Sequence, residues 1–278
     1  MLLCIDVGNT QIALGLYPDP GSDGAEQRPE LIRGWRMRTD ARITADELEV
    51  AIRGLLGRYS TQVTGVAALS TVPTVLRELR LMLDRRAEEM PTVIVEPRVR
   101  TGVPILVDNP KEVGADRVVN TLAAHRLFES ACVVVDFGTS TNIDVVSARG
   151  EFLGGALAPG IEISVEALTT RAAALTTPEL VRPRSVIGKN TVECLQSGIL
   201  YGFTGQVDGL VRRILAELES NERGAGPVTV LATGGLAPLI VGVSDTITEH
   251  VPDLTLLGLR LVYLRSVAST ARRTAAAP

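Results

Sequence analysis

The sequence is poor in the residues that carry redox, metal and stacking chemistry. Its 278 residues include three cysteines, two histidines and only 3% aromatic residues. Cys4, Cys132 and Cys194 lie far apart and form no Cys-x-x-Cys or Cys/His spacing, which argues against a zinc site. The scarcity of aromatic rings argues against a stacking platform for single-stranded nucleic acid. A net charge of -4 argues against non-specific binding to nucleic acid.

Long uncharged apolar runs are also missing. The longest apolar stretch near the C-terminus, Leu254 to Leu264, is interrupted by Arg260, so no run is long enough to cross a bilayer. The N-terminus enters a strand pattern directly and shows no secretory leader. An odd number of cysteines favours a reducing compartment. We therefore expect a cytoplasmic protein that binds neither membrane nor nucleic acid.

What the chain does contain is a short motif that occurs twice. Asp6 to Thr10 reads Asp-Val-Gly-Asn-Thr, and Asp136 to Thr141 reads Asp-Phe-Gly-Thr-Ser-Thr. Each copy follows an apolar, β-branched run and precedes another strand-like run. Glycine allows the turn to approach a phosphate closely, and the aspartate could hold a metal ion directly or through water. Two copies predict two similar halves that grip one nucleotide.

The order of predicted elements repeats with the motif. In the first half, the patterns predict strands at 1–6, 11–17, 31–38, 63–69 and 92–95, and helices from 44 and over 73–86. A helix over 114–127 is predicted at the junction of the two halves. In the second half, the patterns predict helices over 161–175, 190–218 and 254–269, and strands at 131–136, 142–147, 151–156 and 228–232. Thr44 and Glu47 have the spacing of a capping box. We predict two α/β domains with mixed sheets, residues 1–118 and 119–278, and a nucleotide cleft between them.

This organisation resembles the duplicated ribonuclease-H-like fold shared by actin, sugar kinases and heat-shock chaperones. Within that fold, the chain resembles the type III pantothenate kinases over nearly its whole length. The matching blocks, in the order of the family, are 6–10, 109–120, 136–141, 154–161, 188–191 and 233–235. The resemblance implies transfer of phosphate from ATP to pantothenate, giving 4'-phosphopantothenate, the first step of coenzyme A biosynthesis.

Asp116 is the catalytic residue that the resemblance implies. It stands in a Gly-Ala-Asp-Arg sequence at the predicted start of a helix, where the helix N-terminus would stabilise its anionic form. The resemblance gives it the role of general base toward the primary hydroxyl of pantothenate. From its position alone, an ordinary first-turn aspartate on a solvated helix is the better interpretation, and the surrounding motif reverses that preference.

The resemblance also implies a pantothenate site formed by Gly114, Ala115, Asp116, Arg117 and Thr191. Arg117 can make a bidentate contact with the pantothenate carboxylate, although a surface position or an ion pair with Glu112 is the alternative. Gly114 and Ala115 are small enough to let a ligand lie close. Thr191 also fits a helix cap with the preceding asparagine. In the family this pocket closes across a dimer interface, which implies a homodimer.

For ATP and its cations, the resemblance points to the two repeated motifs. The implied ATP contacts are Asp6, Val7, Gly8, Asn9, Thr10, Gln11, Ile12, Ala13 and Thr139. Asp6 would position hydrated Mg2+, and Asp136 would bind a monovalent cation, K+ or ammonium. A structural Asx-turn is the alternative for both aspartates, and their duplicate placement weakens it.

The chain departs from the family pattern at two places. Val107 stands where many members have a tyrosine that lines the substrate pocket, and residues 176–178 read Thr-Thr-Pro where a Leu-Pro pair is common. Two other functions stay open: a kinase for another small hydroxylated substrate, such as a sugar, and a noncatalytic regulatory relative. The Gly-Ala-Asp-Arg block argues against the first, and the intact Asp6, Asp116 and Asp136 argue against the second. The Asp-Phe-Gly tripeptide is not a protein-kinase motif, because no His-Arg-Asp loop accompanies it.

Overall fold

The computed structural model of the chain describes residues 1–19, 29–86, 88, 90–96, 99–172, 175–220 and 226–275. It divides into two compact units. The first unit comprises residues 1–103, 108–127 and 255–278, and the second comprises residues 104–107 and 128–254. Within the described ranges, no helix is long and apolar enough to span a membrane.

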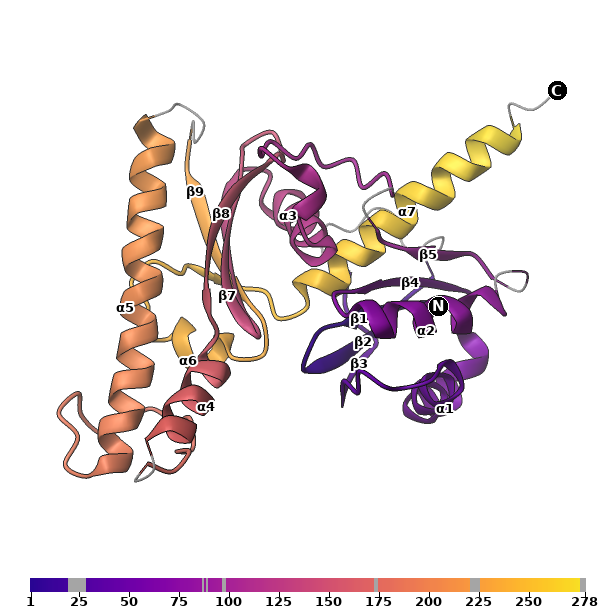
Figure 1. Cartoon of the computed structure of the whole chain (residues 1–278). Helices are drawn as coiled ribbons and strands as arrows, with labels where there is room; N and C mark the ends of the chain where they lie inside the picture. Colours follow the sequence, from indigo (N-terminus) through magenta and orange to yellow (C-terminus); the bar gives the residue numbers. More distant parts are fainter. Residues whose placement is uncertain are drawn as a thin grey trace. The chain divides into compact units, whose positions relative to one another are not determined.

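The first unit is built on a five-stranded mixed sheet (Figure 1). Its strands lie in the order β3 (Arg33–Arg38), β2 (Gln11–Tyr17), β1 (Leu2–Val7), β4 (Gly65–Ser70) and β5 (Thr92–Ile94). Strands β1, β2 and β3 form an antiparallel meander, and β4 runs parallel to β1. The helices are α1 (Ala45–Leu56), α2 (Pro73–Asp84), α3 (Ala115–Phe128) and α7 (Leu254–Ala275), with short 3-10 turns at Gly57–Gln62 and Pro110–Glu112.

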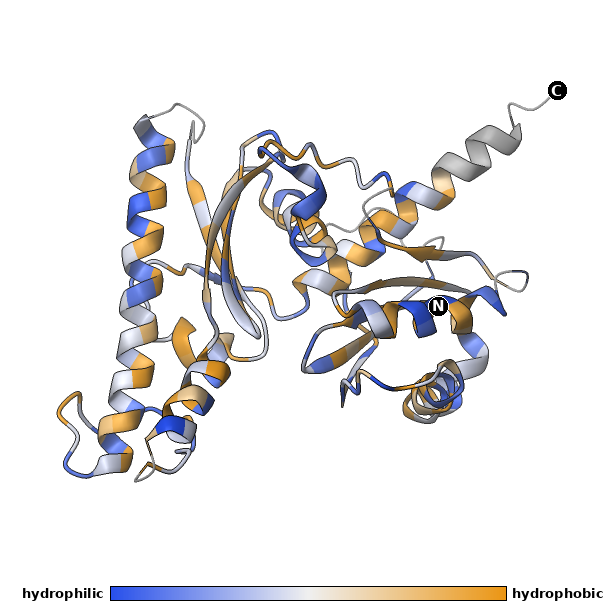
Figure 2. Cartoon of the chain, viewed as in Figure 1, coloured by the Kyte–Doolittle hydropathy of each residue, from blue (hydrophilic) through white to orange (hydrophobic). Residues whose placement is uncertain are grey.

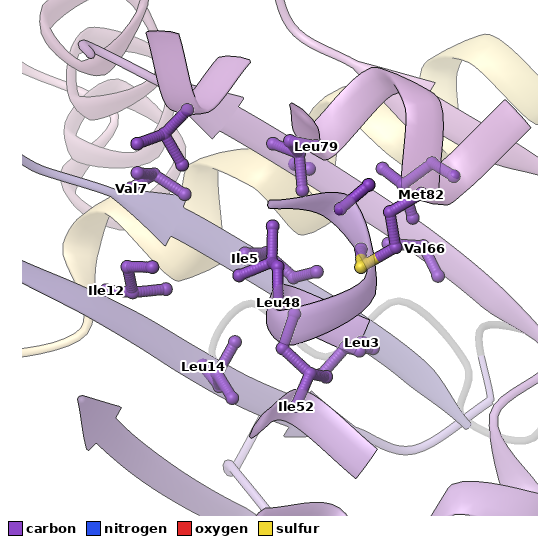
Figure 3. Close-up of a cluster of buried hydrophobic side chains, with 14 of the residues drawn as sticks. Leu3, Ile5, Val7, Ile12, Leu14, Leu48, Ile52, Val66, Leu79 and Met82 are labelled. Carbon is purple, nitrogen blue, oxygen red and sulfur yellow. The ribbon is translucent and has the colours of Figure 1, made fainter. Parts of the chain in front are cut away.

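Alternation along β1 separates the two faces of this sheet. Leu3, Ile5 and Val7 enter the core with α1 and α2, as Figure 3 shows. Leu2 and Cys4 enter a second core with α3 and α7. Because side chains alternate along a strand, Asp6 lies on the side of the sheet that α3 and α7 cover.

Helix α1 begins as the sequence predicted. Thr44 is its N-cap, and its Oγ1 accepts a hydrogen bond from the backbone N–H of Glu47 (3.3 Å). The Glu47 carboxylate accepts in return from the backbone N–H of Thr44 (2.9 Å). The predicted capping box is therefore confirmed.

The second unit repeats the sheet of the first. Its strands lie in the order β10 (Glu249–His250), β9 (Val228–Thr233), β6 (Ala131–Phe137), β7 (Ser140–Val146) and β8 (Phe152–Pro159). One face packs against α4 (Ile161–Arg171), α5 (Thr191–Ser220) and α6 (Ala237–Val241). Helix α5 carries both hydrophilic and hydrophobic residues along its length (Figure 2). The prediction of two α/β domains of like topology is confirmed.

The division between the units differs from the predicted boundary at residue 118. That position lies inside α3, whose Val119 and Leu122 pack in the same core as Leu2 and Cys4 of β1. Helix α7 also joins this core, although its sequence follows the whole of the second sheet. Hydrophobic spacing identifies such helices but cannot say which sheet they cover.

Candidate functional site

The first repeated motif forms the tight turn between β1 and β2. The backbone N–H of Gly8 donates to the carbonyl of Gln11 (3.0 Å). Thr39 holds the turn from the side, because its hydroxyl donates to the Gly8 carbonyl (2.7 Å) and its N–H donates to the Thr10 carbonyl (3.0 Å). The backbone of the turn is thus held by hydrogen bonds, while the side chains of Asn9 and Thr10 are exposed.

The side chains around this turn differ in what they can offer a nucleotide. Val7 and Ile12 are fully buried in the core, so only their backbone atoms could contact ATP. Gln11 is exposed, and Ala13 and Asp6 are half-buried. The expected ATP contacts therefore separate into exposed side chains and residues whose backbone shapes the turn.

The second motif forms the equivalent turn between β6 and β7. The N–H of Gly138 donates to the Ser140 carbonyl (3.0 Å), and the Ser140 hydroxyl donates to Asn142 Oδ1 (2.9 Å). Gly160, just before α4, donates its N–H to the Thr139 carbonyl (3.1 Å). A Cβ atom at Gly160 would overlap that same carbonyl oxygen. The start of α4 can therefore lie on the turn only because residue 160 is glycine.

The late glycine turn after β9 lies directly against the second motif. Thr233 pairs with Asp136 across β9 and β6. Gly234 follows with a φ of +90°, and a Cβ atom there would lie 2.6 Å from Asp136 Oδ1 and 2.5 Å from the Phe137 carbonyl oxygen. Two matching blocks that are far apart in sequence, residues 136–141 and 233–235, are therefore neighbours in the second unit.

Two polar residues of β7 accompany Asp136 and were not predicted from the sequence. Asn142 pairs with Asp136, and Asp144 lies two residues further along the same face. Both are buried, Asp144 with only 1% of its surface exposed. Their alternation with Ile143 and Val145 is the sequence signal that could have identified them.

Asp116 lies in the first turn of α3. It is half-buried, and the backbone N–H of Arg117 donates to its carboxylate. A Cβ atom at Gly114 would overlap Asp116 Oδ1, so the carboxylate occupies space that only glycine leaves open. Gly114 therefore leaves room for the Asp116 carboxylate in this conformation, in addition to any room it leaves for a ligand.

The protonation of Asp116 differs from the sequence-based expectation. Burial raises the pKa of Asp116, and the opposing effects of the Arg117 backbone N–H and the Arg117 charge do not cancel this increase. The helix N-terminus was expected to favour the anion, but loss of contact with water is the larger effect here. A raised pKa makes this carboxylate a better proton acceptor than an ordinary aspartate.

The remaining predicted substrate residues lie in both units. Arg117 is half-buried in the first unit, and the Glu112 carboxylate accepts a hydrogen bond from the side chain of Asn109 (2.5 Å). In the second unit, Asn190 Oδ1 accepts from the backbone N–H of Glu193 (2.9 Å). Asn190 thus caps α5, and Thr191 is exposed in the first turn.

Cations would have to be held by few protein ligands. Among the described residues, no three His, Cys, Asp or Glu side chains gather into a metal site. Asp6 and Asp136 are half-buried carboxylates beside glycine turns. Oxygen donors of this kind fit a hard cation such as Mg2+, which keeps several waters and binds substrate phosphates.

The sequence model of the type III pantothenate kinases matches residues 2–213 of this chain. A type III pantothenate kinase of Saccharopolyspora erythraea is 71% identical over 269 residues, which cover 97% of this chain and 100% of that protein. The chain belongs to the type III pantothenate kinase family. The resemblance inferred from its sequence motifs is therefore confirmed.

Solved structures support the fold of this family member. A ROK family protein from Streptococcus pneumoniae, solved with sucrose, aligns with a TM-score of 0.53 at 13% identity, covering 96% of this chain and 99% of that one. A Campylobacter jejuni protein described as a candidate Baf family transcriptional activator aligns with a TM-score of 0.58 at 15% identity, covering 96% and 99%. At these identities the likeness concerns the fold alone, and it agrees with the expected actin-like architecture.

Val107, which stands where many family members have a tyrosine, lies beside strand β8 of this type III pantothenate kinase. The segment 104–107 lies along β8, where the N–H of Leu106 donates to the Phe152 carbonyl (2.8 Å). Gly154 has a φ of +107°, and a Cβ atom there would lie 3.6 Å from Val107 Cγ1. Val107 therefore packs beside Gly154 near the start of β8.

Proposed function

We propose that this protein transfers the γ-phosphoryl group of ATP to the primary hydroxyl of pantothenate, giving 4'-phosphopantothenate and ADP. The observation that carries the proposal is Asp116, a half-buried carboxylate at the start of α3 whose pKa is raised by burial and which lies against Gly114. Family membership identifies the substrate class. The product places the protein at the first step of coenzyme A biosynthesis.

In this proposal Asp116 is the general base. Its carboxylate accepts the proton of the pantothenate hydroxyl while the hydroxyl oxygen forms a bond to the γ-phosphorus and the bond from that phosphorus to the β,γ-bridging oxygen breaks. Arg117, the next residue, binds the pantothenate carboxylate and so aligns the hydroxyl. Gly114 and Ala115 leave room for the substrate, and Thr191 contributes a hydroxyl to its pocket.

ATP is bound by the two glycine turns in this proposal. The turn at Gly8 and the turn at Thr139 offer backbone N–H groups and exposed hydroxyls to the phosphates. Asp6 holds hydrated Mg2+, and Asp136 holds K+ or ammonium. The cations supply neutralisation of the phosphate charge, which phosphoryl transfer requires. Replacement of K+ by Na+ should weaken the use of ATP, and indifference to the cation would contradict the role of Asp136.

We also propose that the protein is a cytoplasmic homodimer whose two subunits contact each other through the second unit. Apolar side chains are exposed before and within the first turn of α5, namely Val181, Val186, Ile187 and Val192. Along α5, a Cβ atom at Gly198, Gly202 or Gly205 would meet no atom within 4 Å. An exposed apolar segment beside an open helix surface fits contact with a second copy. Sedimentation should give twice the chain mass, and an active monomer would contradict a shared pocket.

The test of function is release of ADP by the purified protein with ATP, Mg2+ and K+, with and without pantothenate. We expect release that depends on pantothenate and is lost in Asp116→Asn, while that variant still binds ATP. A hexose in place of pantothenate is the matched control. Release with the hexose alone would favour a sugar kinase, and no release by folded protein that binds ATP would favour a regulatory role.

A further inference from the structure

Helix α7 contacts the backbone of α3 directly at one glycine. A Cβ atom at Gly258 would overlap the carbonyl oxygen of Val119 and lie 2.7 Å from its carbonyl carbon. Val119 is fully buried, so neither helix has free space at this contact. Any side chain larger than hydrogen at residue 258 must therefore move α7 and α3 apart.

A buried hydrogen bond lies beside this contact. The Thr255 hydroxyl donates to Asn120 Oδ1 (2.9 Å), and only 1% of the Asn120 surface is exposed. Thr255 and Gly258 are three residues apart and share one side of α7. Steric and polar contacts from the same side of α7 thus hold two consecutive residues of α3.

These two residues stand close to Asp116 along α3. Val119 and Asn120 follow Asp116 by three and four residues, and therefore lie one turn away on the same side of the helix. The first turn is closed by the N–H of Val118, which donates to the Gly114 carbonyl (3.2 Å). A displacement of α3 at its contact with α7 is thus carried to the Asp116 carboxylate.

We propose that Gly258 and Thr255 of α7 are positioning residues, which fix α3 and thereby the place of the Asp116 carboxylate relative to the substrate hydroxyl. The proposal rests on the proposed kinase function and on Asp116 as its base. Neither residue touches substrate in this account. A shift of about 1 Å in a reacting group can cost on the order of 100-fold in rate, so a small movement of α3 suffices.

Gly258→Ala tests the steric contact. We expect kcat to fall by about tenfold or more, with the dissociation constant for ATP changed by less than about twofold, because the turn that binds ATP does not lie on α3. The matched control is Gly65→Ala on β4, where a Cβ atom would overlap the Tyr263 hydroxyl of the same helix α7. This control disturbs the packing of α7 against β4 and not its contact with the α3 backbone, so kcat should stay within about twofold even where the melting temperature falls.

Thr255→Val and Thr255→Ser test the polar contact. They also test the proposal if Gly258→Ala does not fold. The valine variant should lose several-fold in kcat, and the serine variant, which keeps the hydroxyl, should retain it. Wild-type protein without pantothenate-dependent turnover would overturn the proposed function itself. If the wild type is active and Asp116→Asn is inactive, a normal kcat in Gly258→Ala would overturn only the positioning role. Equal kcat values in the two Thr255 variants would overturn it as well.

Discussion

Gly234 lies against Asp136, so closely that a Cβ atom on the glycine would come within 2.6 Å of Asp136 Oδ1. The φ of Gly234 is +90°, which a residue with a side chain adopts only under strain. We expect Gly234→Ala to lower the stability of the second unit by about 1–3 kcal/mol and to raise the KM for ATP. Thermal unfolding and ADP release at varied ATP concentrations measure the two effects.

The control for this prediction is the neighbouring glycine. A Cβ atom at Gly235 would meet no atom within 4 Å, and its φ is not in the left-handed region. Gly235→Ala should therefore leave stability and KM close to wild type. Equal effects of the two substitutions would show that the contact between Gly234 and Asp136 is unimportant.

The sequence predicted what depends on neighbouring residues. The two strand–glycine–strand motifs and the Thr44 capping box are local patterns, so composition and spacing were sufficient to find them. Most strands and helices were also located to within a few residues. Helix α6 and strand β10 were missed because five and two residues give too little periodicity.

The sequence could not predict what depends on distant residues. Membership of α3 and α7 in the first unit depends on cores formed with β1. Ile12 was grouped with the ATP contacts, and its side chain is fully buried. The sequence could not show this, because adjacency in a motif does not reveal which way a strand residue points. The raised pKa of Asp116 likewise depends on burial by the fold.

Asp208 of α5 holds the loop that precedes β10. Its carboxylate accepts hydrogen bonds from the Ser244 hydroxyl (2.6 Å), the Thr246 hydroxyl (2.7 Å) and the Asp245 N–H (3.1 Å). Burial would raise the pKa of Asp208, but these donors outweigh it and the net shift is downward. We expect Asp208→Asn to reduce the free energy of unfolding by about 2 kcal/mol at pH 7, because the amide cannot accept from all of these donors.

The pH dependence of the free energy of unfolding tests whether the ionised Asp208 carboxylate is responsible. A lowered pKa stabilises the fold above the unfolded-state value of about 3.9, and the contribution is lost as pH falls through the folded-state pKa. Urea unfolding of wild type and Asp208→Asn should therefore differ most at neutral pH and converge in acid. A difference that stayed constant down to pH 3 would contradict the role of the ionised carboxylate.

A partly open cavity of about 40 Å³ lies at the edge of the core of the first unit, and Ile52, Val66 and Met82 help to line it. These side chains appear together in Figure 3. Val66→Ile adds one methylene group at this cavity and should raise the free energy of unfolding by about 0.8 kcal/mol, without changing turnover. Val75→Ile, at a fully buried position that does not line the cavity, should be neutral or destabilising. Similar melting temperatures for both variants would indicate that the cavity cannot accept the group.

Asp116→Asn should separate catalysis from stability. Turnover requires the ionised carboxylate, so the raised pKa of Asp116 places the acid limb of the wild-type pH–rate profile above the range of an ordinary aspartate. The same burial makes the anion costly to the fold above its folded-state pKa, a cost that disappears as the group is protonated in acid. The neutral amide should therefore lower kcat by about 10²–10⁴-fold and raise the melting temperature at pH 7, with the melting difference shrinking at low pH. Loss of ATP binding in proportion to turnover, or a lower melting temperature at neutral pH, would contradict a buried base at the start of α3.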